Sequence, residues 1–151
     1  MKIFLGADHG GYSYKEVIKK WLEDQKHQVV DVGAHQLDSL DDYPVFAFEA
    51  AKQVSLNNDS LGILFCRSGA GMTIAANKVK NVRAVEVINP LGAEHAKQHN
   101  NANIIALSAD WLDLEAVKKI ISTFLNTPFT NEERHLRRIN QITEFENSHN
   151  N

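Results

Sequence analysis

Short apolar runs alternate with amphipathic segments along the chain. Five runs have the length of β-strands, and all but the second are nearly continuous apolar stretches, which is typical of strands buried on both faces of a parallel sheet. The predicted strands are Lys2–Ala7, Gln28–Val32, Gly62–Cys66, Arg83–Ile88 and Asn103–Leu107.

The segments between these runs show helical spacing. The clearest is Asp113–Asn126, where Val117, Ile120, Ile121 and Phe124 fall on one face and Asp113 is a candidate N-cap. The predicted helices are Tyr12–Asp24, Pro44–Ser55, Met72–Lys78, Leu91–His99, Asp113–Asn126 and a last one from 131 to about 147. Regular alternation of strand and helix predicts a single α/β domain over residues 1–151, an open three-layer α/β/α sandwich with a five-stranded, mostly parallel sheet.

Composition and charge exclude several classes of protein. Hydrophobic residues make up 43% of the chain and the net charge is −3, which gives no overall basic field of the kind that binds nucleic acid or acidic membranes. No apolar stretch is long enough to span a bilayer. The single cysteine cannot form an intramolecular disulfide, and the first residues lack the apolar core of a signal peptide. We therefore expect a cytoplasmic protein without a nucleic-acid or membrane partner.

Reactive side chains gather where predicted strands end. In a parallel sheet, ligands bind outside the carboxyl ends of the strands. Asp8 and His9 follow the first strand in the stretch GADHGGY, whose paired glycines allow close backbone approach to an anion. The alternative interpretation is an ordinary strand–helix turn that Asp8 caps.

A second strand–turn–helix junction, CRSGAGM, begins at Cys66. It has neither the Gly-Lys-Ser/Thr ending of a phosphate loop nor the third glycine of a dinucleotide-binding turn. What it offers is a bend lined by amides beside a thiol, and such amides stabilise a thiolate or a developing oxyanion. From the residues alone, a buried structural cysteine is an equally good interpretation.

Two polar clusters lie outside this pattern. His99 precedes the fifth strand, and Arg134 and Arg138 are four residues apart on one helical face, which suits a phosphate held from two sides. A capping histidine and a solvated helix face are the alternatives. The histidines are scattered and there is no Cys-x-x-Cys, so we predict no metal site.

Together these stretches resemble the type B ribose-5-phosphate isomerase family, which also includes galactose-6-phosphate and allose-6-phosphate isomerases. The resemblance runs from residue 1 to about residue 145 in the family's order. The matching stretches are GADHGGY (6–12), DYPVFA (42–47), CRSGAGMTIAANK (66–78), RAV (83–85), QHNNAN (98–103) and ERHLRRINQI (133–142). It implies a Rossmann-like fold, and a homodimer, often paired into a tetramer, with sites shared between subunits.

The resemblance also implies an aldose–ketose isomerisation without metal or organic cofactor. Cys66 would be the general base that forms a cis-enediolate, and Ser68 would handle the proton on O1 and O2. His99 would assist ring opening, and Asp8 and Tyr43 would hydrogen-bond it or the sugar. The remaining roles fall to the amides around Gly69, Gly71 and Met72 for the enediolate oxygens, to Asn100 for sugar hydroxyls, and to His9, Arg134 and Arg138 for the phosphate.

Two departures from the family pattern lie in the same predicted pocket. Arg67 follows the cysteine where glycine is usual, and Asp110 stands where the family commonly has a phosphate-binding arginine. Arg67 would either supply the missing charge or pair with Asp110. Ribose 5-phosphate is the expected substrate. The alternatives are another sugar or sugar phosphate, such as allose or galactose 6-phosphate, and a non-enzymatic binder on the same fold.

Overall fold

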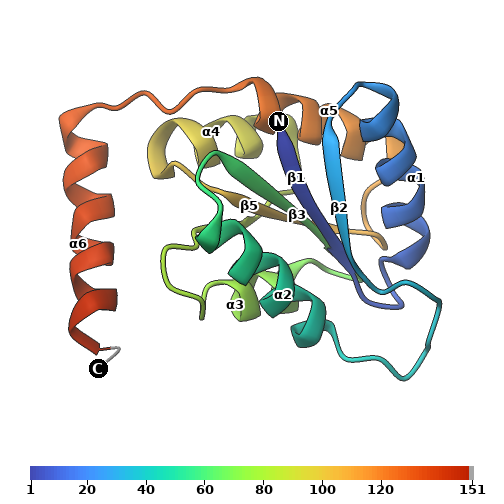
Figure 1. Ribbon diagram of the computed structural model, residues 1–151. Helices are drawn as coiled ribbons and strands as arrows, with labels where there is room; N and C mark the ends of the chain where they lie inside the picture. Colours follow the sequence, from blue (N-terminus) through green and yellow to red (C-terminus); the bar gives the residue numbers. More distant parts are fainter. Residues whose placement is uncertain (150–151) are drawn as a thin grey trace.

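The five strands form one sheet in which every neighbouring pair is parallel. The computed structural model describes residues 1–149, and its strands lie in the order β2 (Gln28–Gly33), β1 (Lys2–Ala7), β3 (Ser60–Cys66), β5 (Ile104–Ser108) and β4 (Ala84–Glu86) (Figure 1). The central strand β3 is buried along its whole length. The predicted α/β fold class is confirmed.

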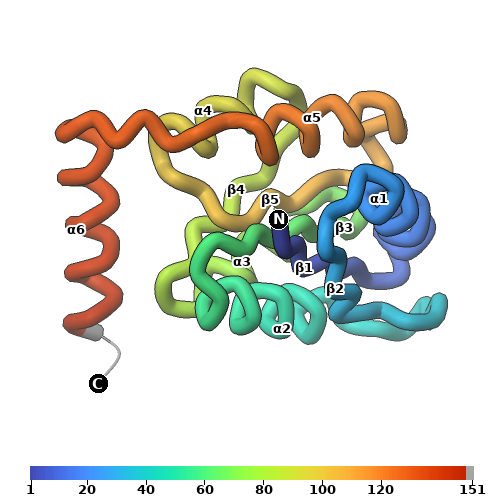
Figure 2. Tube along the Cα trace, turned by 45° about the horizontal axis from the view of Figure 1, so that its top comes forward, coloured from blue at the N-terminus to red at the C-terminus, as the bar shows by residue number. Residues whose placement is uncertain are grey.

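Helices cover both faces of the sheet, as Figure 2 shows. One core lies under α1 (Tyr12–Asp24), α4 (Pro90–Asn100) and α5 (Leu114–Asn126), and the other lies under α2 (Tyr43–Leu56) and α3 (Ala70–Ala76). Because both cores are apolar and each strand alternates its side chains between them, the inner strands need the continuous aliphatic runs seen in the sequence.

The elements that differ most from the sequence prediction lie at the sheet edges. β4 has only three residues, half the predicted length, because it pairs on one side alone and only from Ala84 to Glu86. The other edge strand, β2, is exposed at Gln28 and half-buried from Val29 to Val32, and its one acid, Asp31, pairs with Lys15 at 2.8 Å. In the interior, β3 begins at Ser60 rather than Gly62, because Ser60 and Leu61 already pair with β1.

The last helix, α6 (Glu133–His149), extends beside the sandwich rather than lying on the sheet (Figures 1 and 2). Glu146 accepts a hydrogen bond from the backbone N–H of Asn81 at 3.1 Å. Leu136 and Ile142 on this helix are 36% and 52% exposed. Within residues 1–149, no helix combines the length and apolarity needed to cross a membrane.

Candidate active site

Asp8 and Cys66 leave the sheet side by side. In the parallel pairing of β1 with β3, Ala7 lies opposite Phe65, so the next residue of each strand emerges at the same carboxyl edge. Both side chains are buried, with exposures of 6% for Asp8 and 5% for Cys66. Two of the predicted catalytic residues are therefore neighbours at the edge of the sheet where α/β proteins bind ligands.

The turn after Cys66 wraps around its sulfur. Gly69 adopts a left-handed conformation, with φ of +92°, and its N–H donates a hydrogen bond to Sγ of Cys66 at 3.0 Å. The Ala70 N–H donates to Oγ of Ser68 at 3.3 Å. Gly71 and Met72 lie in the first turn of α3, where backbone N–H groups have no acceptor within the helix. Such amides stabilise negative charge on the sulfur or on a ligand oxygen.

The β1–α1 turn holds the two other polar residues of this edge. The Gly11 N–H donates to Oδ1 of Asp8 at 3.1 Å, and burial raises the pKa of Asp8 above its usual value. The ring of His9 lies with Nδ1 2.7 Å from Oδ1 of Asp41, and this bond raises the pKa of His9. The surroundings thus disfavour the charged form of the Asp8 carboxyl and favour the charged form of the His9 ring.

Arg67 lies over the β1–α1 turn at the same carboxyl edge. A Cβ on Gly10 would come within 2.6 Å of Cγ of Arg67, so the arginine stem packs on the β1–α1 turn. Its guanidinium nitrogen lies 3.5 Å from Oδ2 of Asp110, and the two side chains are 68% and 44% exposed. The pairing foreseen from the sequence is present. An exposed pair of this length contributes at most about 1 kcal/mol.

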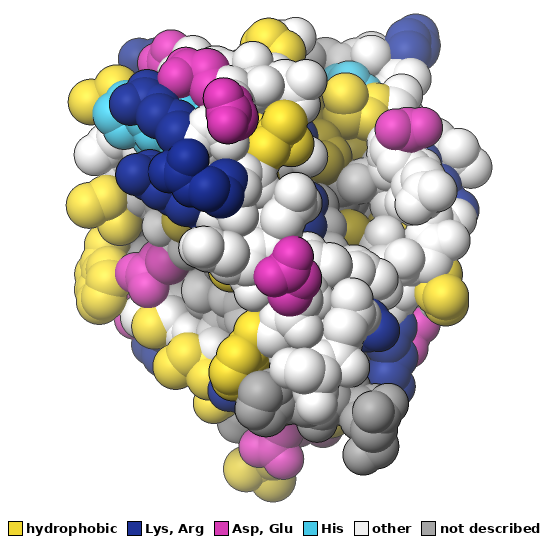
Figure 3. Space-filling model, turned by 90° about the vertical axis from the view of Figure 1, so that its left-hand side faces the viewer, with side chains coloured by type: hydrophobic (Ala, Val, Ile, Leu, Met, Phe, Trp, Pro, Cys, Tyr) yellow, Lys and Arg dark blue, Asp and Glu magenta, His cyan; other side chains and the backbone are white. Residues whose placement is uncertain are grey.

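Of the other predicted residues, Tyr43 lies against Gly71 beside the turn that follows Cys66. The rest form a second group around α4 and α6. The ring of His99 stacks on His95, with centroids 4.7 Å apart, and lies 4.6 Å from His135. Burial, followed by the positive neighbours, lowers the pKa of His99. Arg134 pairs with Glu132 at 2.8 Å. Seen from the α6 side, basic side chains gather beside a histidine (Figure 3).

Asn100 and Arg138 belong to this second group as well. Both line a cavity of about 320 Å³, together with Ile139 and Ile142 of α6. The cavity separates α6 from the edge strand β4, whose Ala84 and Val85 also line it. The polar lining consists of the amides of Asn77 and Asn100, the guanidiniums of Arg83 and Arg138 and the carboxylate of Glu146.

One helix length separates the two groups. α4 starts after β4, at the carboxyl edge of the sheet, and ends before β5, at the amino edge. Its 11 residues span about 16 Å at 1.5 Å per residue. His99 and Asn100 are at the far end, so this chain does not bring them to its own Cys66.

The comparisons with known proteins agree with the fold and the motifs. Residues 3–142 match the Ribose/Galactose Isomerase family. The chain belongs to this family. The probable ribose-5-phosphate isomerase B of Mycoplasma pneumoniae is 41% identical over 144 residues, which are 95% of this chain and 94% of that protein. The ribose-5-phosphate isomerase B of Mycobacterium tuberculosis H37Rv is 38% identical over 99% of this chain and 92% of its own length.

Solved structures of this ribose/galactose isomerase family are also close. The ribose-5-phosphate isomerase B of Mycoplasma genitalium, a crystal structure with bound ribulose 5-phosphate, superposes with a TM-score of 0.93 at 41% identity, covering 97% of this chain and 96% of that one. The enzyme from Clostridium thermocellum gives 0.93 at 38% identity, with 98% and 99% covered. The predicted family and enzyme class, an isomerase, are confirmed.

Sequence reasoning missed one residue of the carboxyl edge, Asp41. Its only sequence signal was an acid pair before Tyr43, which reads equally well as a solvated loop. One atom from each of Asp8, His9 and Asp41 lies within 4.8 Å of the others, a spacing that a metal ion could use. However, Nδ1 of His9 is already hydrogen-bonded to Asp41, so a metal at that nitrogen would have to break this bond.

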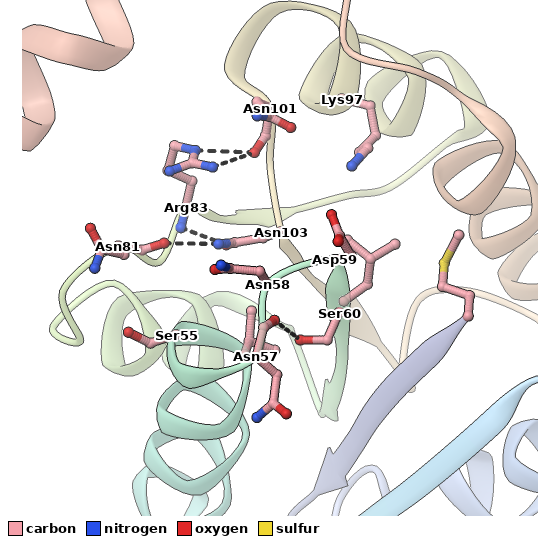
Figure 4. A pocket seen from close by; sticks show the side chains of 13 residues that line it. Ser55, Asn57, Asn58, Asp59, Ser60, Asn81, Arg83, Lys97, Asn101 and Asn103 are labelled. Atoms are coloured by element: carbon pink, nitrogen blue, oxygen red, sulfur yellow. Dashed lines mark hydrogen bonds between the residues drawn. The ribbon is translucent and has the colours of Figure 1, made fainter.

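A cavity of about 910 Å³ lies at the opposite edge of the sheet (Figure 4). Asparagines line much of it, and Lys97 points into it, whereas Arg83 bonds the last carbonyls of α4. The carboxyl ends of α2 and α4 face this space and carry partial negative charge. None of the predicted catalytic residues lines it, so its size does not make it the substrate site.

Proposed function

We propose that this isomerase interconverts ribose 5-phosphate and ribulose 5-phosphate, with Cys66 as the general base. The observation that carries the proposal is the hydrogen bond from the Gly69 N–H to Sγ of Cys66 at 3.0 Å, made beside Asp8 in a chain of this family. A backbone N–H aimed at the sulfur orients it and can stabilise negative charge that develops beside it. The ribulose 5-phosphate bound to the relative from Mycoplasma genitalium supports the choice of substrate.

The proposed chemistry moves one proton between two carbons of the open-chain sugar. The Cys66 thiolate takes the proton from C2, which leaves a cis-enediolate, and returns it at C1. Ser68 shifts the proton between O1 and O2, and the amides of Gly71 and Met72 stabilise the enediolate oxygens. Neither a metal nor an organic cofactor is needed for these steps.

The second group of residues would complete the site from another copy of the chain. His99 and Asn100 lie about one helix length from Cys66 in their own subunit. In a homodimer with two-fold symmetry, each carboxyl edge would receive the partner's α4 end and α6, and each site would gain His99 for ring opening. Arg134 and Arg138 would join His9 at the phosphate. A pair of dimers forming a tetramer is compatible with the same sites.

A different sugar phosphate is the second candidate. Asp110 would place a carboxylate near the expected phosphate, and Arg67 pairs with it at 3.5 Å. In a substrate with a longer carbon chain, the phosphate would lie farther from Cys66 and at a different distance from Asp110 and Arg67. Allose and galactose 6-phosphates are therefore the competing substrates. Reducing conditions protect a cysteine base from oxidation, so we expect the protein to act in the cytoplasm.

Turnover by Cys66→Ala compared with wild type tests the proposal. The expected loss in kcat is about 10²- to 10⁴-fold with ribose 5-phosphate, while allose and galactose 6-phosphates react more slowly with wild type. Ser60→Ala, at the other end of the same strand, is the matched control and should keep full activity. Turnover of none of the three phosphates, or a fully active Cys66→Ala protein, would refute the proposed function.

A further inference from the structure

Asp41 lies beneath His9 although 32 residues separate them. Its Oδ1 accepts the backbone N–H of His9 at 2.9 Å and lies 2.7 Å from Nδ1 of the same residue. The Asp41 side chain is only 10% exposed, against 28% for His9. The loop that carries Asp41 is fixed locally, because Asp38 accepts the N–H of Asp41 at its carbonyl and that of Leu40 at Oδ1.

This contact sets both the direction and the proton of the imidazole. A carboxylate oxygen only accepts, so Nδ1 of His9 carries the hydrogen and Nε2 faces away from Asp41. Among residues 1–149, Nε2 has no hydrogen-bond partner. We propose that Asp41 is a positioning residue that holds His9 as an imidazolium, with its Nε2–H directed at the substrate phosphate. The inference rests on the proposed function for the role of His9.

The charges around His9 agree with this role. Asp8 and Asp41 face it with negative charge, and Arg67 faces it with positive charge. The hydrogen bond that His9 donates to Asp41 is the largest contribution raising the pKa of His9, and Asp8 adds to it, whereas burial and Arg67 act against it. The doubly protonated ring is thereby favoured by Asp41 and Asp8 before any phosphate binds.

The second carboxylate oxygen of Asp41 is in an unusual environment. This oxygen, Oδ2, is buried and has no hydrogen-bond partner among the described residues. Folded proteins seldom leave a buried carboxylate oxygen unpaired, and each exception calls for a reason. Asparagine would satisfy the backbone N–H of His9 equally well, so the charge itself, rather than the shape, is what this position supplies.

The test compares Asp41→Asn with Asp38→Asn, an exposed acid of the same loop that does not touch His9. Asparagine keeps an acceptor for the backbone N–H, so the fold should survive. We expect Asp41→Asn to lower the pKa of His9. This pKa is measured by NMR titration of the His9 ring in the free protein. Asp41→Asn should also raise the Kd for inorganic phosphate and the KM at pH 7.5 by roughly 5- to 50-fold, with kcat within about threefold. Asp38→Asn should match wild type in all four quantities.

The outcomes separate this inference from the proposed function. An unchanged pKa of His9 in Asp41→Asn would overturn the inference, as would an equal fall in kcat and kcat/KM with no change in phosphate binding. If wild type does not isomerise ribose 5-phosphate, the proposed function falls. The inference stands in that case when the pKa of His9 and the phosphate affinity drop together in Asp41→Asn alone.

Discussion

The ring of Tyr43 packs against the backbone of Gly71. A Cβ on Gly71 would lie 2.8 Å from Cζ of Tyr43, closer than any real side-chain contact. The first residue of α2 is thereby locked to the turn that follows Cys66. Gly71→Ala should push Tyr43 out of place at a cost of about 1–3 kcal/mol. We expect kcat/KM to fall at least about tenfold, measured with ribose 5-phosphate.

Gly92→Ala is the control for this change. Gly92 lies inside α4, and a Cβ there would meet its nearest atoms at 3.5 Å, an ordinary contact distance. Alanine should therefore stabilise that helix by about 0.5–1 kcal/mol and leave kcat/KM unaltered. Equal activity of the Gly71→Ala and Gly92→Ala proteins would show that the Tyr43 contact has no part in the reaction.

The pair formed by Arg67 and Asp110 should influence binding more than stability. Because both side chains are largely exposed, Asp110→Asn should change the free energy of unfolding by less than about 1 kcal/mol. The same variant removes a negative charge from the carboxyl edge and frees Arg67, so KM for ribose 5-phosphate should fall by about 2- to 10-fold. Arg67→Met should raise it. A lower KM for a 6-phosphate, with no change for ribose 5-phosphate, would favour the longer sugar as substrate.

The fold could be predicted well from the sequence because burial of the strands determines where apolar residues must stand. Ile63, Leu64 and Phe65 are wholly inaccessible in β3, and only a continuous apolar run satisfies a strand covered on both faces. The carboxyl-edge chemistry followed from the same pattern, because parallel strands must end together. The length of β4 was predicted wrongly, because hydrogen bonding on one side alone, rather than hydrophobicity, decides where an edge strand stops.

The spacing of apolar residues could not predict contacts between distant loops. Asp41 meets His9 only because the β2–α2 loop folds back over the β1–α1 turn. His99 and His135 come together across 36 positions because α6 begins beside the end of α4. Neither pairing has a spacing that periodicity would reveal. Each pairing depends on the path that a loop takes after a strand or helix has ended.

The cluster around His99 should be visible in the pH dependence of stability. Burial and the nearby His135, His95 and Arg134 lower the pKa of His99, so the folded chain favours its neutral ring. As the pH falls below about 6.5, the unfolded chain takes up a proton that the folded one resists, and stability is lost down to the lowered pKa. The melting temperature of His99→Gln should therefore decline less than that of wild type between pH 7 and pH 5. A decline as steep as that of wild type would contradict this.

Mixing two inactive variants tests whether the site is shared between subunits. Cys66→Ala removes the proposed base, and His99→Asn removes the ring-opening group, so each protein alone should be nearly inactive. When subunits exchange, about half of the dimers contain one copy of each variant. If Cys66 of one copy works with His99 of the other, each mixed dimer has one intact site and about a quarter of the wild-type activity returns. If both residues act within one chain, every site keeps a lesion, and the mixture stays as inactive as its components.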